Sequence, residues 1–220
     1  SSKSKGNGIG FAGIGAKVYL AAYPDTEIIT ETCCGSDSLA SKMYLKDRKI
    51  MWKLLKSERK IVGTSYSVIL REEDYNYLEK NLEELVIESF NNAILGGLKI
   101  TINGESVKPW LPKAVKTKQG VLTVGAKKLP FTFLLCEDEI PSHRRNMELH
   151  VSGKKITVRK PSYILDLKAE YQNKIYVVVN AMDISDYLKT DKVSFKPGFV
   201  NFHVIRRLDK ETLKIATELG

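Results

Sequence analysis

The sequence lacks the features of a membrane-spanning or exported protein. None of its apolar runs approaches the roughly 20 residues that a membrane-spanning helix needs, and no signal peptide is visible. Cysteine is scarce, since only Cys33, Cys34 and Cys136 are present, and their spacing fits no metal-ligand motif. Adjacent cysteines rarely bridge each other, because disulfide geometry disfavours it. We therefore expect free thiols, no metal site formed by cysteines, no membrane contact and a cytoplasmic location.

Internal repeats and low-complexity segments are also absent. The composition, 43% hydrophobic and 28% charged, is that of an ordinary globular protein. The 220 residues suffice for one large domain or two small ones. The net charge of +9 allows nucleic-acid binding, but the lysines alternate with glutamates instead of forming one block. A solvated, lysine-rich surface therefore explains most of this charge.

The most informative segment is glycine-rich. Residues 5–17 read KGNGIGFAGIGAK, and the apolar run 18–22 follows directly. A glycine-dense loop that leads into a helix lets backbone N–H groups approach an anion without obstruction by Cβ atoms. The helix N-terminus adds partial positive charge. The segment therefore indicates a phosphate-binding loop, with a flexible N-terminal loop as the alternative.

Hydrophobic periodicity predicts the first half of the chain. Apolar residues from Leu78 to Ile94 recur at helical spacing, with Asp74 as a cap and Gly96-Gly97 as the end. Asn103-Gly104 between two short strands is typical of a type I′ hairpin. The other expected elements are a helix over 18–23 and strands over 27–32, 39–45, 50–55, 63–70 and 98–102.

The second half begins with a polar, lysine-rich stretch at 112–120, where we expect a domain boundary or hinge. His143, Arg144 and Arg145 are expected to form an exposed basic loop, and His150 to be structural. Beyond the boundary the pattern predicts strands over 129–135, 147–158 with a turn at 152–153, and 174–179, then helical segments over 184–188 and 200–219.

Three of these features occur in a fixed order: the glycine-rich loop, a Gly-Thr pair at a strand start, and a hairpin after a long helix. Together they resemble the GHKL ATPase superfamily of DNA gyrase B, MutL, histidine kinases and the ninety-kilodalton heat-shock chaperone. GFAGIGAK at 10–17 is similar to the end of that family's ATP lid, GTSYSVIL at 63–70 to its Gly-Thr element, and 102–107 to its closing hairpin. The T-E-T strand at 29–32 and LKTDK at 188–192 resemble uncharacterised archaeal and bacterial members.

The resemblance implies an α+β fold and an ATP site. Residues 1–115 would be the C-terminal part of a GHKL sandwich with a mostly antiparallel sheet, and residues 116–220 a mixed α/β, transducer-like domain. A lysine of that second domain contacts the γ-phosphate in the family, which assigns this catalytic role to Lys192; the alternative is an ordinary loop lysine. Thr64 would lie near adenine or simply occupy a strand position. The residues implied in phosphate binding are Gly10, Phe11, Ala12, Gly13, Ile14, Gly15 and Lys17.

The sequence departs from the family in one respect. A helix with E-x-x-x-N, which supplies the general base and a magnesium ligand, and a D-x-G-x-G motif that binds adenine do not precede the glycine loop. Phosphoryl transfer needs a positioned metal and a group that orients the nucleophile. We therefore expect the chain to be a fragment that binds ATP without hydrolysing it, with the Mg²⁺ ligand outside these residues.

The resemblance further implies a homodimer that forms on ATP binding. A second hypothesis is a basic nucleic-acid-binding module related to the topoisomerase and mismatch-repair ATPases, with DNA as its partner. A third is an interaction scaffold with a degenerate nucleotide site. Titration with ATP separates the first hypothesis from the third, and the salt dependence of DNA binding tests the second.

Overall fold

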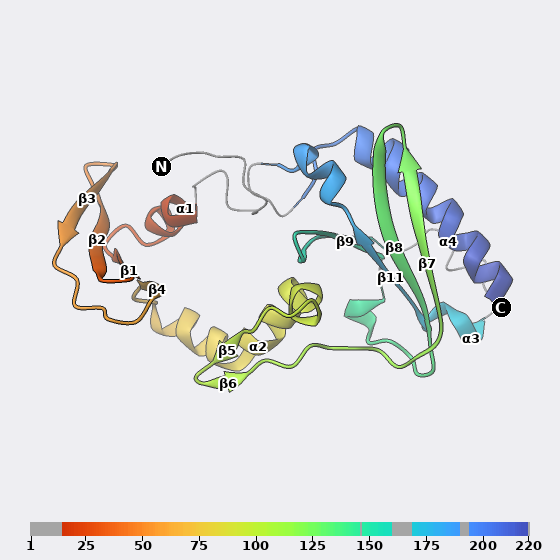
Figure 1. The fold of residues 1–220 in the computed structure, drawn as a ribbon, viewed down its shortest axis with the longest axis horizontal. Helices are drawn as coiled ribbons and strands as arrows, with labels where there is room; N and C mark the ends of the chain where they lie inside the picture. Colours follow the sequence, from red (N-terminus) through yellow and green to blue (C-terminus); the bar gives the residue numbers. More distant parts are fainter. Residues whose placement is uncertain (1–14, 146, 160–168, 190–193, 220) are drawn as a thin grey trace. The chain divides into compact units, whose positions relative to one another are not determined.

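The computed structural model describes residues 15–145, 147–159, 169–189 and 194–219 (Figure 1). The described residues divide into two compact units, one within Gly10–Lys80 and one within Asn81–Gly220, which we call the N-terminal unit and the C-terminal unit. The division falls within helix α2 (Glu72–Leu95). The boundary expected between residues 115 and 116 stays a prediction.

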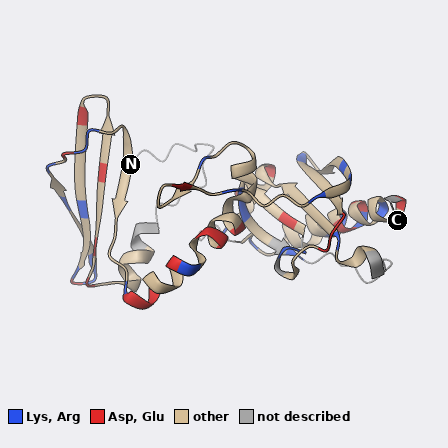
Figure 2. Ribbon diagram, turned by 90° about the horizontal axis from the view of Figure 1, so that it is seen from below, with Lys and Arg blue, Asp and Glu red and all other residues tan. Residues whose placement is uncertain are grey.

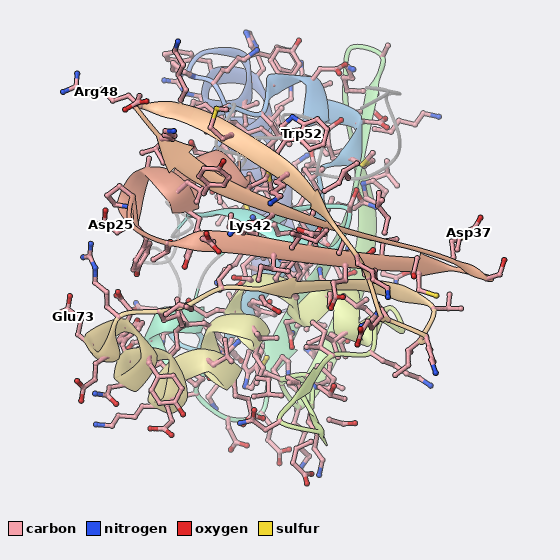
Figure 3. The ribbon with its side chains drawn as sticks, turned by 90° about the vertical axis from the view of Figure 1, so that its left-hand side faces the viewer. Asp25, Asp37, Lys42, Arg48, Trp52 and Glu73 are labelled. Atoms are coloured by element: carbon pink, nitrogen blue, oxygen red, sulfur yellow. The ribbon has the colours of Figure 1, made fainter. Side chains whose placement is uncertain are left out.

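The N-terminal unit combines helix α1 (Gly15–Ala22) with a four-stranded antiparallel sheet in the order β3-β2-β1-β4. The turn between β2 and β3 has positive φ at both Asp47 and Arg48, which is the requirement of a type I′ turn. Trp52 lies on β3 and Arg48 at this hairpin end (Figure 3). The strands are β1 (Glu27–Cys34), β2 (Asp37–Lys46), β3 (Lys49–Leu55) and β4 (Gly63–Ser67).

One face of this sheet is largely apolar, and Asp37 at the start of β2 is the one charged residue among its paired positions. The register aligns Ile28, Met43 and Trp52 in one row, and Tyr66, Thr30, Ser41 and Leu54 in the next. Because side chains alternate between the two faces of a strand, Lys42, Lys53 and the acidic residues of β1 lie on the opposite face. Trp52 and Tyr66 remain 66% and 71% exposed, so this apolar face is largely open.

Helix α2 links the two units. Its first turn is acidic, with Glu72, Glu73 and Asp74 (Figure 2), which suits the positive end of the helix dipole. Asp74 lies inside this first turn, so its expected role as the cap is wrong. Gly97 has a φ of 101° and ends the helix, as expected from its freedom at positive φ. The hairpin that follows consists of β5 (Thr101–Ile102) and β6 (Glu105–Ser106).

The C-terminal unit contains a mixed five-stranded sheet in the order β10-β9-β11-β8-β7. Only the β11–β9 pair is parallel. The strands are β7 (Ala114–Val124), β8 (Lys127–Cys136), β9 (Met147–Val151), β10 (Lys154–Arg159) and β11 (Ile175–Asn180). The helical segments are 3-10 turns η1 (Ser142–Arg144) and η3 (Met182–Tyr187), α3 (Ala169–Gln172), the π-helix η4 (Val200–Ile205) and α4 (Arg206–Leu219).

The core of this unit lies between one face of the sheet and the helix formed by η4 and α4, which runs along the sheet in Figure 1. Phe133, Leu149, Val177 and Leu208 are fully buried there. The alternation of apolar residues along β8 and β11 selects this face, since every second side chain points to it. The opposite face therefore carries a different set of residues, which includes Glu148, His150 and Tyr176.

The predicted α+β class is confirmed at this level: a mostly antiparallel four-stranded sheet, a long helix and a mixed five-stranded sheet. The expected strand over 63–70 ends earlier, at Ser67. Cys33, Cys34 and Cys136 are free, as expected. In the described part of the chain, no helix is long and apolar enough to cross a membrane.

Candidate functional site

The glycine-rich segment lies at the border of the described residues. Gly10, Phe11, Ala12, Gly13 and Ile14, five of the expected phosphate-binding residues, fall outside them. Lys192, expected to contact the γ-phosphate, also falls outside them. The described part begins at Gly15, which is the first residue of α1, and Lys17 follows in the first turn of this helix. That first turn contains no acidic residue, so no carboxylate competes there for the free backbone N–H groups.

The C-terminal half of α1 is fixed to the segment between β4 and α2. The hydroxyl of Tyr19 donates a 2.5 Å hydrogen bond to the carbonyl of Ile69, and Arg71 donates one of 3.2 Å to the carbonyl of Ala22. Tyr23 stacks on Tyr19 at 4.9 Å and lies 4.8 Å from the Arg71 guanidinium. These contacts hold the helix in place without using its N-terminus.

The last contact of α1 involves an acidic partner. Tyr23 donates a hydrogen bond to Asp74 of α2, and this bond raises the pKa of Tyr23, with burial and the charge of Asp74 acting in the same direction. A small hollow of about 170 Å³ lies nearby, lined by Tyr23, Asp25 and Arg71 among others. It lies at the C-terminal end of α1, where the helix dipole is negative, so it does not suit a phosphate.

Thr64, the residue expected near adenine, lies on β4. Its hydroxyl is 3.1 Å from the hydroxyl of Thr32 on the neighbouring strand β1, and both residues are exposed. The register places both on the apolar face of the four-stranded sheet, in line with Leu39. Thr64 is thus available at an apolar surface, but the described residues do not bring it together with a phosphate-binding group.

The C-terminal unit contains a buried polar cluster that the sequence patterns did not single out. Glu148 is 3% exposed and accepts hydrogen bonds from His150 at 2.9 Å and from the Tyr176 hydroxyl at 2.8 Å. The ammonium of Lys155 lies 3.9 Å from Glu148 and 3.2 Å from Glu88 of α2. Glu148 and His150 are two residues apart in β9, and side chains at this spacing point to the same face of a sheet. This spacing is the sequence signal that could have identified the pair.

The ionisation of Glu148 follows from these partners. Burial by itself would raise the pKa of the carboxyl, but the hydrogen bonds from His150 and Tyr176 and the charge of Lys155 outweigh it and lower the pKa below the ordinary value. Burial and the negative charge of Glu148 raise the pKa of Tyr176 well above its ordinary range. Glu148 is therefore a charged acceptor, and Tyr176 a neutral donor, in the folded protein.

Helix α2 covers this cluster with its second half. Arg144 donates a hydrogen bond to Glu84 and lies over the ring of Trp110 at 4.9 Å. It is only 6% exposed, so the expectation of an exposed basic loop is wrong for this residue. Asn91, the buried residue of α2, exchanges two hydrogen bonds of 2.8 and 2.7 Å with the backbone of Trp110. The indole in turn meets Tyr176 edge-on at 5.2 Å.

Beside α2 the same sheet face remains open and forms a groove of about 810 Å³. Strands β7, β8 and β11 form its floor, and α2 and the segment 110–112 form one side. Among the described residues that line it, none is Lys, Arg, Asp or Glu. His150 and Tyr176 also line it, but His150 Nε2 and the Tyr176 hydroxyl are bonded to Glu148, and His150 Nδ1 lies 3.4 Å from the carbonyl of Gly153. The apolar lining includes Trp110, Leu111, Pro112, Leu134, Val178 and Met182.

A metal site is not evident in the described residues, since no group of three or more His, Cys, Asp and Glu side chains gathers there to hold an ion. Burial raises the pKa of the Cys136 thiol to about 11, so this thiol stays protonated and is a poor nucleophile or ligand at neutral pH. Comparison with known proteins found no matching family model and no matching curated protein.

Proposed function

We propose that this chain is the ATP-binding portion of a GHKL-type ATPase, in which the bound nucleotide changes the conformation of the protein. The observation that supports this most is the start of α1 at Gly15, the last glycine of the run. A helix that begins in a glycine-rich loop offers backbone N–H groups and a positive dipole to a phosphate. The absence of an acidic residue in its first turn favours the same ligand.

The described contacts of α1 are consistent with this role. Its C-terminal half is anchored through Tyr19, Tyr23 and Arg71, so a phosphate at its N-terminus would meet a helix that is already positioned. Preorganised donors lose little entropy when the ligand binds. Thr64, exposed on the apolar sheet face, would contact the adenine end. Lys192 would supply a point charge to the γ-phosphate.

The proposal has a catalytic limit. Because E-x-x-x-N and D-x-G-x-G do not precede the glycine loop in these 220 residues, we expect ATP binding without hydrolysis. Mg²⁺ would then be held by the ATP phosphates and by ligands outside these residues. Magnesium-dependent phosphate release by the purified chain would contradict this limit. A coding sequence that continues upstream into the two motifs would support the family.

Isothermal titration with ATP and Mg²⁺ tests the proposal. Gly13→Val would place a side chain where the backbone must approach the phosphate, and we expect it to weaken ATP binding at least about tenfold. Lys17→Ala should weaken binding less, and Lys46→Ala, an exposed lysine of the same unit, should leave it unchanged. Equal affinity for the wild type and Gly13→Val would refute the assignment of the loop.

A second candidate function, nucleic-acid binding, is favoured by one observation. Residues 46–60 carry seven Lys or Arg and two Asp or Glu, and the exposed Trp52 lies among them. Lys49 and Lys53 lie on the sheet face opposite to Trp52, so the argument rests on the basic groups, which suit contacts with the phosphate backbone. An affinity for oligonucleotides that falls steeply with salt, and weakens in a Lys49→Glu/Lys53→Glu variant, would support this function. Binding that is indifferent to salt would exclude it.

A further inference from the structure

The groove of the C-terminal unit differs in character from the rest of the protein. Charged residues make up 28% of the chain, yet none occurs among the described residues that line this space. A volume of about 810 Å³ is within the range of roughly 300–1,000 Å³ that is typical of small-molecule sites. Its lining is mostly apolar, with a few amide and hydroxyl groups.

Trp110, which forms part of the wall of the groove, is held in place by contacts within the protein. Asn91 holds the backbone of Trp110 through two hydrogen bonds, while Tyr176 and Arg144 contact the indole itself. The Trp110 side chain is therefore held on several sides. A rigid aromatic wall reduces the entropy that is lost when a ligand is bound.

The polar groups that line the groove are of two kinds. His150 and Tyr176 are bonded to Glu148, so these ionisable groups are already satisfied within the protein. The side-chain amides of Asn92 and Gln119 also line the groove, and they make no hydrogen bond with another described residue. Amides can donate and accept hydrogen bonds to neutral polar groups.

We propose that this groove is a binding site for an uncharged, largely apolar aromatic small molecule that carries a hydrogen-bonding group of amide or hydroxyl type. A charged ligand would lose its hydration in the groove without gaining an opposite charge, which disfavours it. An aromatic ring would gain contact with Trp110 and the apolar floor. The site belongs to the C-terminal unit and does not depend on ATP binding at the glycine loop.

A matched pair of probes tests this proposal. N-phenyl-1-naphthylamine is neutral, and 1-anilinonaphthalene-8-sulfonate has the same ring system with one negative charge. The protein carries two tryptophans, so a Trp52→Phe variant, excited at a wavelength that tyrosine does not absorb, leaves Trp110 as the only energy-transfer donor. We expect saturable binding of the neutral probe with energy transfer from Trp110, and at least about tenfold weaker binding of the sulfonate.

Two lysine substitutions locate the site. Thr132→Lys in β8 and Leu111→Lys at a 69% exposed position both introduce a charge into the lining, and each should weaken the neutral probe at least about tenfold. If Thr132→Lys does not fold, Leu111→Lys still tests the site, because a lysine is tolerated at an exposed position. Thr123→Lys is the control, since Thr123 is exposed on β7 outside the lining.

The outcomes divide clearly. Loss of binding in the two groove variants, with retention in Thr123→Lys, supports the site. Absence of saturable binding, absence of energy transfer from Trp110, or equal affinity for both probes overturns it. Binding that persists unchanged in Leu111→Lys and a folded Thr132→Lys also overturns it, because the probe would then occupy another apolar surface.

Discussion

Replacement of Glu148 by glutamine is predicted to destabilise the C-terminal unit by about 2 kcal/mol. The carboxylate accepts hydrogen bonds of 2.9 Å from His150 and 2.8 Å from Tyr176. A hydrogen bond to a charged acceptor is stronger than one to a neutral acceptor by about 1 kcal/mol, and two such bonds are affected. Glutamine keeps the shape of the side chain, so the change removes charge without opening a cavity.

The loss should depend on pH with a definite sign. The pKa of Glu148 is lowered in the folded protein relative to its ordinary value of 4.5. The ionised carboxylate therefore stabilises the fold fully above about that ordinary value, and this contribution is lost as the pH falls through the lower folded pKa. The difference between the wild type and Glu148→Gln should accordingly be constant near neutral pH and shrink in acid.

Urea denaturation followed by Trp110 fluorescence in a Trp52→Phe background measures this difference at each pH. Glu211→Gln is the matched control, because Glu211 forms an exposed pair with Lys214 at 3.1 Å, and it should change the free energy of unfolding by less than about 0.5 kcal/mol. Equal effects of the two substitutions, or a difference that grows as the pH falls, would refute the reasoning.

Three further substitutions probe other contacts. Asn91→Ala leaves two backbone groups of Trp110 without their partner and should cost about 2–4 kcal/mol in urea denaturation. Gly120→Ala places a Cβ 2.5 Å from the ring of the buried Phe131, and a thermal melt should show a loss of about 1–3 kcal/mol. Thr64→Val removes an exposed hydrogen bond of 3.1 Å to Thr32, and it should change the free energy of unfolding by less than about 1 kcal/mol. If Thr64 contacts adenine, an ATP titration of the same variant should show weaker binding.

Most secondary structure could be predicted because local signals are strong here. The helical spacing from Leu78 to Ile94, the two glycines after it and the Asn103-Gly104 turn each specify an element, and α2, β5 and β6 follow these signals. Asn103 and Gly104 have φ of 52° and 89°, as a type I′ turn requires. Local sequence determines such features because they depend on neighbours within a few residues.

The segment at 112–120 contains a strand that the local pattern did not predict. Its polar, lysine-rich composition predicted a domain boundary or hinge, which stays a prediction, whereas from Ala114 it forms the edge strand β7, paired with β8. Lys116 and Lys118 are exposed there, as lysines on edge strands often are. Residues 114–120 pair with residues of β8 that are more than ten positions away in the sequence, which composition alone does not reveal.

The candidate sites were predictable to different degrees. The glycine loop is a local motif and was recognised in the sequence, although most of its residues lie outside the described part of the chain. The groove and the Glu148 cluster depend on the pairing of β9 with β11 and on the placement of α2 over them. Arg144 is buried because Trp110 and Glu84 meet it there, and no pattern around residue 144 indicates these distant partners.

The measurement that tests the central proposal most directly is the response of the backbone amides to ATP. In ¹⁵N-labelled protein, addition of ATP with Mg²⁺ should shift the amide resonances of Gly13, Gly15 and Lys17 in a saturable way, because these groups would donate hydrogen bonds to phosphate. The basic segment 46–60 should respond little. Shifts confined to residues 46–60, or no saturable shift in the glycine-rich segment, would contradict the assignment of a phosphate-binding loop.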